Sequence, residues 1–388
     1  MVRRTVARRV LVGVIASATF ARVLVPQSPA LAGAARPTTA AAGIEVAHGR
    51  LALGGRPYRV VGLDAYELPT MWGSNAGCGS MLSNTQLDGF FGSMPRHSLV
   101  RIWAWQGSMA TDIATKKLDW RPLDRVVHAA AAHGDFLVVS LAGQSGGCDD
   151  GHWKGPQWYR GGYRQAYDDD RRGLAPLPYA TYLRDVVGRY AGSPAIGMWE
   201  LVNEPESSSC ASGFSGDGCY PHLSCSDEHG AAAALRSFFD VEGAVVHRLD
   251  PHHLVEAGFI GSGQCGTSGA DYSLVGRSKG IDVLSYHDYY PAGVAVGGDR
   301  WNGIAVREAQ AAALGKPIIA GELGVEAGSG SACPTYSQRV TQVRAKTSQQ
   351  MARGTDAVLV WDWQPGPTSG CDFSTYPGDP LLRLIGPR

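Results

Sequence analysis

Apolar runs of strand-like length recur along the chain from residue 59 onwards, and they alternate with stretches whose apolar residues follow helical spacing. The runs predict eight strands, at Arg59–Ala65, Leu99–Trp105, Phe136–Ala142, Ile196–Val202, Leu254–Phe259, Val283–Tyr286, Pro317–Gly321 and Ala357–Trp361. The stretches between them predict helices at Leu123–His133, Tyr179–Tyr190, Glu228–Leu249, Ile304–Leu314 and Tyr336–Arg353. Strands that are buried on both faces form continuous apolar runs, so this alternation predicts an α/β chain folded as a (β/α)8 barrel.

The connections favour the barrel over a doubly wound sheet, which is the alternative for alternating strands and helices. A doubly wound sheet usually has fewer strands and a glycine-rich phosphate turn after the first, whereas here Asp64-Ala65-Tyr66 follows. Segments after the predicted strands are long and rich in Gly, Trp, Tyr and Cys. In barrels, the loops at the C-terminal ends of the strands carry binding and chemistry. Ahead of the first strand, Ile44–Tyr58 predicts a short β-hairpin.

The N-terminal residues predict an export signal. Four arginines precede a mostly apolar stretch from Val10 to Val25, and Ala30-Leu31-Ala32 fits a small-residue cleavage site. Arg22 interrupts the apolar stretch and makes it a poor membrane span. The predicted organisation is a signal peptide at 1–32, cleaved near Ala32, a flexible linker at 33–43, and a single barrel domain at 44–388. The protein is therefore expected to be secreted, by either the general or the twin-arginine route.

The charge balance argues against nucleic acid as a partner. The chain has 35 basic and 35 acidic residues, and removal of the predicted signal with its five arginines leaves a net charge near −5. No basic block remains to meet a phosphate backbone. No later stretch approaches 18 consecutive apolar residues, so we expect no stable membrane association after signal cleavage. We also predict a monomer.

The eight cysteines lie in Gly/Ser-rich segments outside the apolar runs, at positions 78, 148, 210, 219, 225, 265, 333 and 371. An even number in the loops of an exported chain predicts disulfides, whereas a zinc site would need close pairs such as C-x-x-C, which the sequence lacks. We expect a Cys333–Cys371 bond and a local pair within Cys210, Cys219 and Cys225.

Two acidic motifs have simple structural interpretations. Cys148–His152 has no standard metal-ligand spacing and is expected to be a solvated turn. Asp168–Arg172 is expected to be an exposed run that neutralises itself.

The stretch Trp199–Glu206 is the most informative part of the chain. A strand-like apolar run ends on Asn203 and Glu204, and Pro205 then stops regular structure. Strands seldom end this way for packing reasons, because two polar groups with unmet hydrogen bonds would lie beside a core. Apolar and aromatic surroundings disfavour the charged form of a carboxylic acid, so Glu204 is a candidate general acid and later a general base.

A second strand-like run, Pro317–Gly324, places Glu322 at the same kind of position. In a barrel, Glu204 would follow the fourth strand and Glu322 would end the seventh, so the two would face each other across the mouth. Carboxyl groups about 5–5.5 Å apart suit hydrolysis of a glycosidic bond with retention of configuration. Glu322 would then be the nucleophile, held ionised by nearby donors.

Several segments match a known family in chain order, namely Val100–Trp105, Asn203–Pro205, Ser285–Pro291, Glu322 and Val360–Trp363. Through them the chain resembles glycoside hydrolase family 5, within the clan of barrels that carry catalytic glutamates at strands four and seven. Val100–Trp105 and the segment that ends on Pro205 look most like those of endo-β-1,4-mannanases. The resemblance extends from about Ile44 to Trp363.

The resemblance implies roles for the polar residues of these segments. Arg101 would fork to the Glu322 carboxylate, and Asn203 would bind the sugar 2-hydroxyl. His287 and Tyr289 would lie beside the nucleophile, with Tyr289 donating a hydrogen bond to it. Each of these residues also has a purely structural alternative. Arg101 could form a structural ion pair, Asn203 could cap a strand end, and His287 could be a buried histidine of the barrel core.

The resemblance also implies a tryptophan platform for the sugar. Trp361 would offer its face at the cleavage subsite, and Trp103 and Trp105 would serve neighbouring subsites. Further candidates are Trp153, Trp158 and Trp363. Loop packing is the alternative role for each of them.

Two positions depart from the family pattern. Ser140–Gln144 follows the third strand where members often carry His or Asn, and Gly321 precedes Glu322 where many mannanases have a second acid. Both concern the choice of sugar and leave the reaction type unchanged. We therefore predict a retaining glycosidase of β-linked polysaccharides, a mannan endo-1,4-β-mannosidase, that needs neither cofactor nor metal. A β-1,4- or β-1,3-glucanase, a transglycosylase and a non-catalytic glycan-binding protein are the alternatives.

Overall fold

The computed structural model describes residues 43–70, 82–107, 117–167, 175–210, 223–225, 227–330, 332–367 and 369–388. The predicted signal peptide and nearly all of the predicted linker lie outside these ranges, as do Cys78, Cys219 and the whole of the predicted exposed run Asp168–Arg172. The proposed division into signal, linker and domain therefore stays a prediction.

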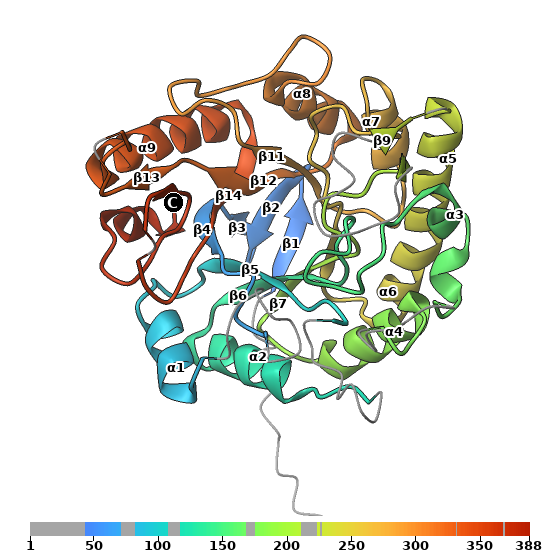
Figure 1. The fold of residues 1–388 in the computed structure, drawn as a ribbon, viewed down its shortest axis with the longest axis horizontal. Coiled ribbons are helices and arrows are strands. Elements are labelled where there is room, and N and C mark those ends of the chain that lie inside the picture. The colour runs from blue at the N-terminus through green and yellow to red at the C-terminus, as the bar shows by residue number, and fades with distance from the viewer. Residues whose placement is uncertain are drawn as a thin grey trace, which may run out of the picture. The chain divides into compact units, whose positions relative to one another are not determined.

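Eight parallel strands of the described chain form a sheet that closes on itself (Figure 1). They are β4 Val60–Asp64, β5 Leu99–Trp103, β6 Phe136–Ser140, β7 Ile196–Glu200, β10 Leu254–Glu256, β11 Leu284–Asp288, β12 Ile318–Gly324 and β14 Thr355–Trp361. Their order is β10-β7-β6-β5-β4-β14-β12-β11, and a parallel bridge between Glu256 and Val283 joins the two ends. The predicted (β/α)8 barrel is confirmed, and every predicted strand corresponds to one of these eight.

Helices surround the strands (Figure 1). Their bounds are α1 Asn84–Gly92, α2 Arg121–His133, α3 Pro156–Tyr159, α4 Tyr179–Tyr190, α5 Glu228–Phe238, α6 Ala244–Leu249, α7 Asp271–Gly276, α8 Ile304–Leu314 and α9 Tyr336–Arg353. Local signals set several ends: Thr335 and Gln338 form a capping box ahead of α9, and Gly315 ends α8 in the left-handed conformation. The predicted helix at 228–249 is present, but a π-helical segment, η2 Phe239–Gly243, separates α5 from α6.

Short elements complete the described chain. Two 3-10 turns, η1 Gly162–Arg164 and η3 Pro380–Leu384, lie in the connections. The strand pairs are β8 Ser209–Cys210 with β9 Leu223–Ser224, and β13 Ala327–Gly328 with β15 Cys371–Asp372, while β16 Gly386–Pro387 pairs with β4.

The predicted N-terminal hairpin is a three-stranded sheet of β1 Ile44–Ala47, β2 Arg50–Leu53 and β3 Arg56–Pro57. Ile44 and Leu51 are buried in one apolar cluster with barrel residues such as Phe136 and Met198. Arg50 pairs with Asp356 at the start of β14. The hairpin therefore covers the N-terminal end of the barrel, which leaves the C-terminal ends of the strands for chemistry.

The disulfides connect the long loops that follow the strands. Cys333–Cys371 joins the loops after β12 and β14, as predicted. Cys225 bonds Cys265 and so joins the loops after β7 and β10, which removes Cys225 from the local pair predicted within Cys210, Cys219 and Cys225. The sequence did not indicate this bond, because it depends on which loops the barrel brings together. A Cys210–Cys219 bond involves residues outside those described in full and stays a prediction.

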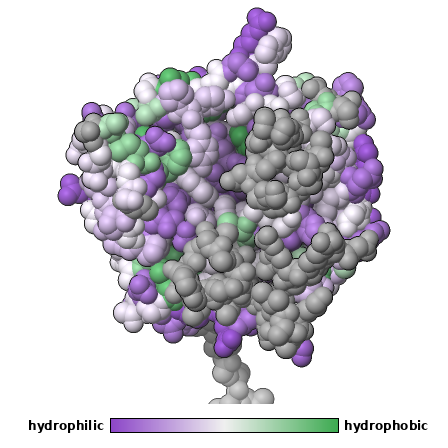
Figure 2. All heavy atoms as spheres, in the orientation of Figure 1, coloured by the Kyte–Doolittle hydropathy of each residue, from purple (hydrophilic) through white to green (hydrophobic). Residues whose placement is uncertain are grey.

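One face of the described chain is mostly polar where it is coloured in Figure 2. Figure 2 shows hydrophilic residues over much of the coloured part of one face, with hydrophobic residues in small groups between them. Among the described helices, none combines the length and the apolar character that a bilayer crossing requires.

Candidate active site

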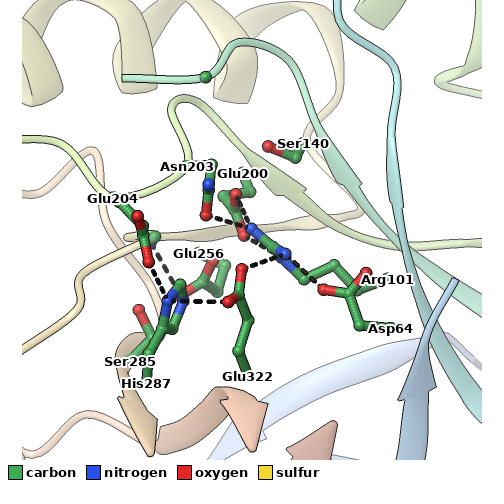
Figure 3. Close-up of polar contacts among 12 residues, drawn as sticks. Asp64, Arg101, Ser140, Glu200, Asn203, Glu204, Glu256, Ser285, His287 and Glu322 are labelled. Carbon is green, nitrogen blue, oxygen red and sulfur yellow. Dashed lines mark hydrogen bonds and ion pairs between the residues drawn. The ribbon is translucent and has the colours of Figure 1, made fainter. Parts of the chain in front are cut away.

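Polar side chains gather at the C-terminal ends of neighbouring barrel strands (Figure 3). The group comprises Asp64 of β4, Arg101 of β5, Glu200 of β7 with Asn203 and Glu204 after it, Glu256 of β10, His287 of β11 and Glu322 of β12. Parallel barrel strands end at the same face, so residues 258 positions apart in sequence meet there. Most of this group is buried; the Glu204 side chain is the most accessible, at 30%.

Arg101 is the centre of the group, and each N–H of its guanidinium has an acceptor. Nε and Nη2 bind the two oxygens of Glu200 at 2.7 Å each, Nη1 binds Asp64 and Glu322 (3.0 Å), and Nη2 also binds Asn203 Oδ1 at 2.6 Å. The guanidinium fork was expected on Glu322, but it binds Glu200. Glu322 receives a single bond from Nη1, because Glu200 presents both oxygens to the plane of the guanidinium.

Glu322 is aimed into the site by an irregularity in β12. Ala320 pairs with Tyr286 and Glu322 with His287, so Gly321 is an extra residue in β12. Such bulges re-aim side chains next to active sites. A Cβ at Gly321 would lie 3.0 Å from His287 Nε2, so a side chain there would crowd the ring. This accounts for glycine at the position where the sequence departs from the mannanase pattern.

Two further groups contact the Glu322 carboxylate. Tyr289 donates its hydroxyl to Oε2 at 2.6 Å, and His287 Nδ1 lies 3.4 Å from the same oxygen. Burial raises the pKa of Glu322, and although His287 and Arg101 oppose this, the pKa stays above its ordinary value. The expectation that nearby donors hold Glu322 ionised is therefore only partly met, because burial is the larger effect.

Glu204 is fixed by its backbone. Its φ of 59° lies in the left-handed region, which is uncommon for a residue other than glycine. Its N–H donates to Gly258 O at 2.8 Å, and Pro205 fixes the chain beyond it. Its Oε1 lies 2.8 Å from His287 Nδ1. Atoms of Glu204, His287 and Glu322 all lie within 4.8 Å of one another, so the structure brings the two glutamates together around one ring.

His287 mediates between the two glutamates (Figure 3). Burial of the ring disfavours its charge, but the charges of Glu322 and Glu204 outweigh that effect and raise the pKa of His287 to about 9. Below this pH the ring is a cation whose Nδ1–H can donate to Glu204. Nδ1 of His287 is thus used for hydrogen bonding, and we assign no metal to Glu204, His287 and Glu322.

Four aromatic rings flank the polar group. Tyr66, after β4, stacks on Trp361 with centroids 4.9 Å apart and an interplanar angle of 7°. Trp103 lies against both, at 4.2 Å from Tyr66 and 5.6 Å from Trp361. Trp105 is only 2% exposed, stacks under Trp103 at 3.7 Å and donates to Ser140 Oγ. Trp105 therefore supports Trp103, and its burial corrects the idea that it offers a face to a ligand.

The three remaining tryptophan candidates lie in the loops after the strands and differ in burial. Trp158 and Trp363 are buried, Trp158 among other aromatic rings and Trp363 against Phe90. Trp153 is half-buried and donates to Ser208 O. Loop packing accounts for the first two.

The acidic turn after β6 differs from the expectation. Asp149 and Asp150 are buried, and both pair with the fully buried Lys154, at 3.3 and 3.0 Å. Asp150 also accepts from the Tyr167 hydroxyl. The predicted solvated turn is therefore wrong: these carboxylates anchor the long loop after β6, as a buried lysine requires.

Four residues of the site escaped the sequence reasoning: Asp64, Tyr66, Glu200 and Glu256. Each acid lies within or at the end of an apolar run, which is the signal that identified Glu204. Glu200 was visible in the same way, between Trp199 and Leu201. Tyr66 carried no comparable signal, because a tyrosine after a strand commonly packs a loop.

A (β/α)8 barrel with two glutamates this close at the ends of its fourth and seventh strands has the framework that cleavage of a glycosidic bond requires. Comparison with known proteins also concerns whether the chain is related to glycosidases. No model of a protein family matches the chain.

Two curated relatives are mannanases. The chain is 34% identical to the probable mannan endo-1,4-β-mannosidase C of Aspergillus terreus over 190 residues, which is 45% of this chain and 42% of the relative. It is 27% identical to the mannan endo-1,4-β-mannosidase A of Emericella nidulans over 325 residues, 77% of this chain and 75% of the relative. In the first of these the match spans less than half the relative's length. The predicted resemblance to endo-β-mannanases is confirmed.

Solved structures show the fold. The endo-1,4-β-mannanase of Rhizomucor miehei superimposes with a TM-score of 0.63 at 18% identity, covering 88% of this chain and 96% of its own. A mutant of a glycoside hydrolase family 5 mannosidase from the same organism gives 0.58 at 16% identity, covering 89% and 96%. At these identities the likeness establishes the barrel.

Proposed function

We propose that the protein is a secreted retaining glycoside hydrolase that cleaves β-1,4-linked mannan within the chain. The observation that supports this most is the meeting of Glu204 and Glu322, whose carboxylate atoms come within 4.8 Å. An inverting enzyme needs about 6.5–9.5 Å to fit a water between its acids, whereas a retaining enzyme uses about 5–5.5 Å. The short separation favours the retaining reaction.

In this reaction Glu322 attacks the anomeric carbon while Glu204 protonates the departing oxygen. Glu204 then removes a proton from water, which releases the sugar from Glu322. Arg101 and Tyr289 hold the Glu322 carboxylate in place. Because Arg101 occupies Asn203 Oδ1, the Asn203 amide N–H groups are the donors available to a sugar hydroxyl. Trp361 and Tyr66 supply aromatic surface beside this point.

Mannan is the first choice of substrate because the curated relatives described above have mannan endo-1,4-β-mannosidase in their names. The monomeric state and the export of the protein belong to the same proposal. The activity is tested by incubating the purified protein with mannan, glucomannan, cellulose and laminarin and measuring product sizes. The proposal predicts manno-oligosaccharides of several lengths from mannan. Faster release from cellulose or laminarin would overturn the choice of mannan.

The Glu204→Gln variant separates an enzyme from a glycan-binding protein. It should lose hydrolysis while it keeps affinity for mannan, because the amide preserves the shape of the site and cannot donate an acidic proton. A wild-type protein that binds mannan without turnover would contradict the proposed reaction. Products longer than the starting oligosaccharide, at high acceptor concentration, would instead identify a transglycosylase.

A further inference from the structure

Glu256 lies directly behind the active site and has no part in the reaction described above. It ends β10, its side chain is fully buried, and it stands opposite Glu200 in the register of β10 and β7. This pairing places the two side chains on the same face of the barrel, and each acid shifts the pKa of the other. Glu256 Oε2 is buried without a donor among the described residues. Two buried carboxylates side by side would repel each other, so we expect one of these acids to carry a proton.

The contacts decide which acid holds the proton. Glu200 accepts two N–H bonds from Arg101 at 2.7 Å each, and its role as a double acceptor requires the ionised form. Among the described residues no cation forms an ion pair with Glu256, and its Oε1 accepts from Gly258 N–H at 2.9 Å. Burial of Glu200 is outweighed by Arg101, which lowers its pKa to about 2, whereas burial and the charge of Glu200 raise the pKa of Glu256 to about 8.

The other groups around Glu256 do not change this assignment. Glu200 of β7 and Tyr272 of α7 interact electrostatically with Glu256. Arg101 of β5, His287 of β11 and Glu322 of β12 belong to the same polar group at the strand ends. Arg101 is already saturated by its own acceptors. The Tyr272 hydroxyl donates to Ser285 O. The proton on Glu256 therefore has Glu200 as its acceptor.

We propose that Glu256 is a protonated positioning residue, whose O–H donates to Glu200 and so holds Arg101 against the Glu322 carboxylate. This proposal rests on the function proposed above for Glu322. The second oxygen of Glu256 reaches the other catalytic glutamate. It accepts from Gly258 N–H, and Gly258 O in turn accepts from Glu204 N–H at 2.8 Å. One buried acid thus joins the supports of both reacting carboxyl groups.

The glycine at position 258 is part of this connection. Its φ is +69°, and a Cβ there would lie 2.1 Å from Val202 O and 3.2 Å from Glu200 Cγ. Only glycine lets the turn after β10 approach the chain that precedes Glu204. The turn cannot shift outward without breaking its bond to Glu256.

Two substitutions at position 256 test the positioning role by kinetics. Glu256→Gln keeps a donor for Glu200 and an acceptor for Gly258, so kcat on mannan should stay within about twofold of wild type. Glu256→Leu removes both, and we expect kcat to fall at least about tenfold with KM changed much less, because small displacements of reacting groups are costly. Glu242→Gln, at another buried carboxyl in η2, is the control and should leave both constants unchanged.

The dependence of stability on pH tests the proton itself and needs no activity. The pKa of Glu256 is raised from 4.5 to about 8 on folding, so the stabilisation from its proton is complete below pH 4.5 and is lost as pH rises to about 8. Gln cannot lose a proton. The Tm of Glu256→Gln should therefore rise relative to wild type between these pH values and then stay constant. The infrared band of a protonated carboxyl at neutral pH should be present in wild type and reduced in this variant.

The outcomes separate this inference from the proposed function. A flat Tm difference across this pH range, with no infrared change, would show an ionised Glu256 and overturn the inference. A Gln variant as impaired as the Leu variant, or a Leu variant as active as wild type, would overturn the positioning role. A protein that cleaves no glycan but shows the Tm and infrared effects would refute the proposed function alone and leave the shared proton in place.

Discussion

At the scale of single residues, Arg101 sets the electrostatics of the site. It is fully buried, and its five hydrogen bonds reach four side chains, three of which are acids. A lysine has three donors on one atom and cannot reproduce the planar fork. Arginine is therefore required here by geometry as well as by charge.

Replacement of Arg101 by lysine tests this requirement. Arg101→Lys should lower kcat/KM on mannan by at least about tenfold, because Glu322 loses its fixed donor. The loss of partners for buried Glu200 and Asp64 should also lower the free energy of unfolding, by up to about 3–5 kcal/mol. Steady-state kinetics and denaturant unfolding measure both. Arg121→Lys, at an exposed pair with Asp119, should change neither, and equal effects in the two variants would contradict the account.

The protonation of Glu322 should limit activity in acid. In the proposed reaction Glu322 attacks only when ionised. Because its pKa lies above the ordinary 4.5, kcat/KM should fall as pH drops through a value above 4.5. Tyr289→Phe removes a donor that favours the ionised form, so the acid limb should move to still higher pH. The pH profile of kcat/KM is the measurement. An acid limb that stays in place or moves down in Tyr289→Phe contradicts this, and Tyr376→Phe, beside Tyr336, is the control.

The sequence predicted which residues of the site are polar but not how they pair. Glu204 and Glu322 stood out because each ends an apolar run, and the barrel then placed them at one mouth. The fork from Arg101 to Glu200 depends on the pairing of β5, β6 and β7 in space, which no local pattern encodes. The burial of Asp149 and Asp150 likewise depends on Lys154, whose pairing is set by the fold of one loop.

At the scale of elements, the barrel strands and most of the long helices followed from periodicity, with α4, α8 and α9 at the predicted bounds, but α1 Asn84–Gly92 was not predicted. The helices α3 and α7 are four and six residues long, too short to show a period, and this explains why they were not predicted. The π-helical segment η2 was not predicted either, because it is only five residues long and lies within a continuous helical stretch.

The disulfide between the loops after β12 and β14 supports the site. Beside Cys371, Phe373 contacts the Tyr289 ring edge-on at 5.4 Å, and Tyr289 holds Glu322. Replacement of Cys333 and Cys371 by serine should lower the free energy of unfolding by about 3–4 kcal/mol, for a closed loop of this length. It should also lower kcat, because the loop that carries Phe373 is no longer tied in place against Tyr289. The matched change at Cys225 and Cys265, with a separation of 40, should cost similar stability. Unchanged Tm values would contradict this.

At the scale of the whole molecule, the two ends of the barrel have separate tasks. The N-terminal end is closed by the hairpin through Ile44 and Leu51, and the C-terminal end holds the polar group around Arg101. This division follows from parallel strands, whose loops after the strands all emerge at one face. Stability and activity should therefore respond to mutations at different ends.

Leu51→Ala tests this separation. Leu51 is fully buried, so its truncation should lower the free energy of unfolding by about 3 kcal/mol, with kcat and KM on mannan close to wild type at temperatures where the variant is folded. Leu53→Ala, at a partly buried position of the same hairpin, should cost less. A large change in kcat for Leu51→Ala would show that the ends are coupled.

The most direct test of the account is to capture the covalent intermediate. A 2-deoxy-2-fluoro β-manno-oligosaccharide with an activated leaving group reacts with a retaining enzyme and then hydrolyses slowly. Mass spectrometry of peptides from the labelled protein should place the sugar on Glu322, and Glu322→Gln should remain unlabelled. A sugar on any other residue, or none on a protein that cleaves mannan, would contradict the pairing of Glu204 and Glu322 as acid and nucleophile.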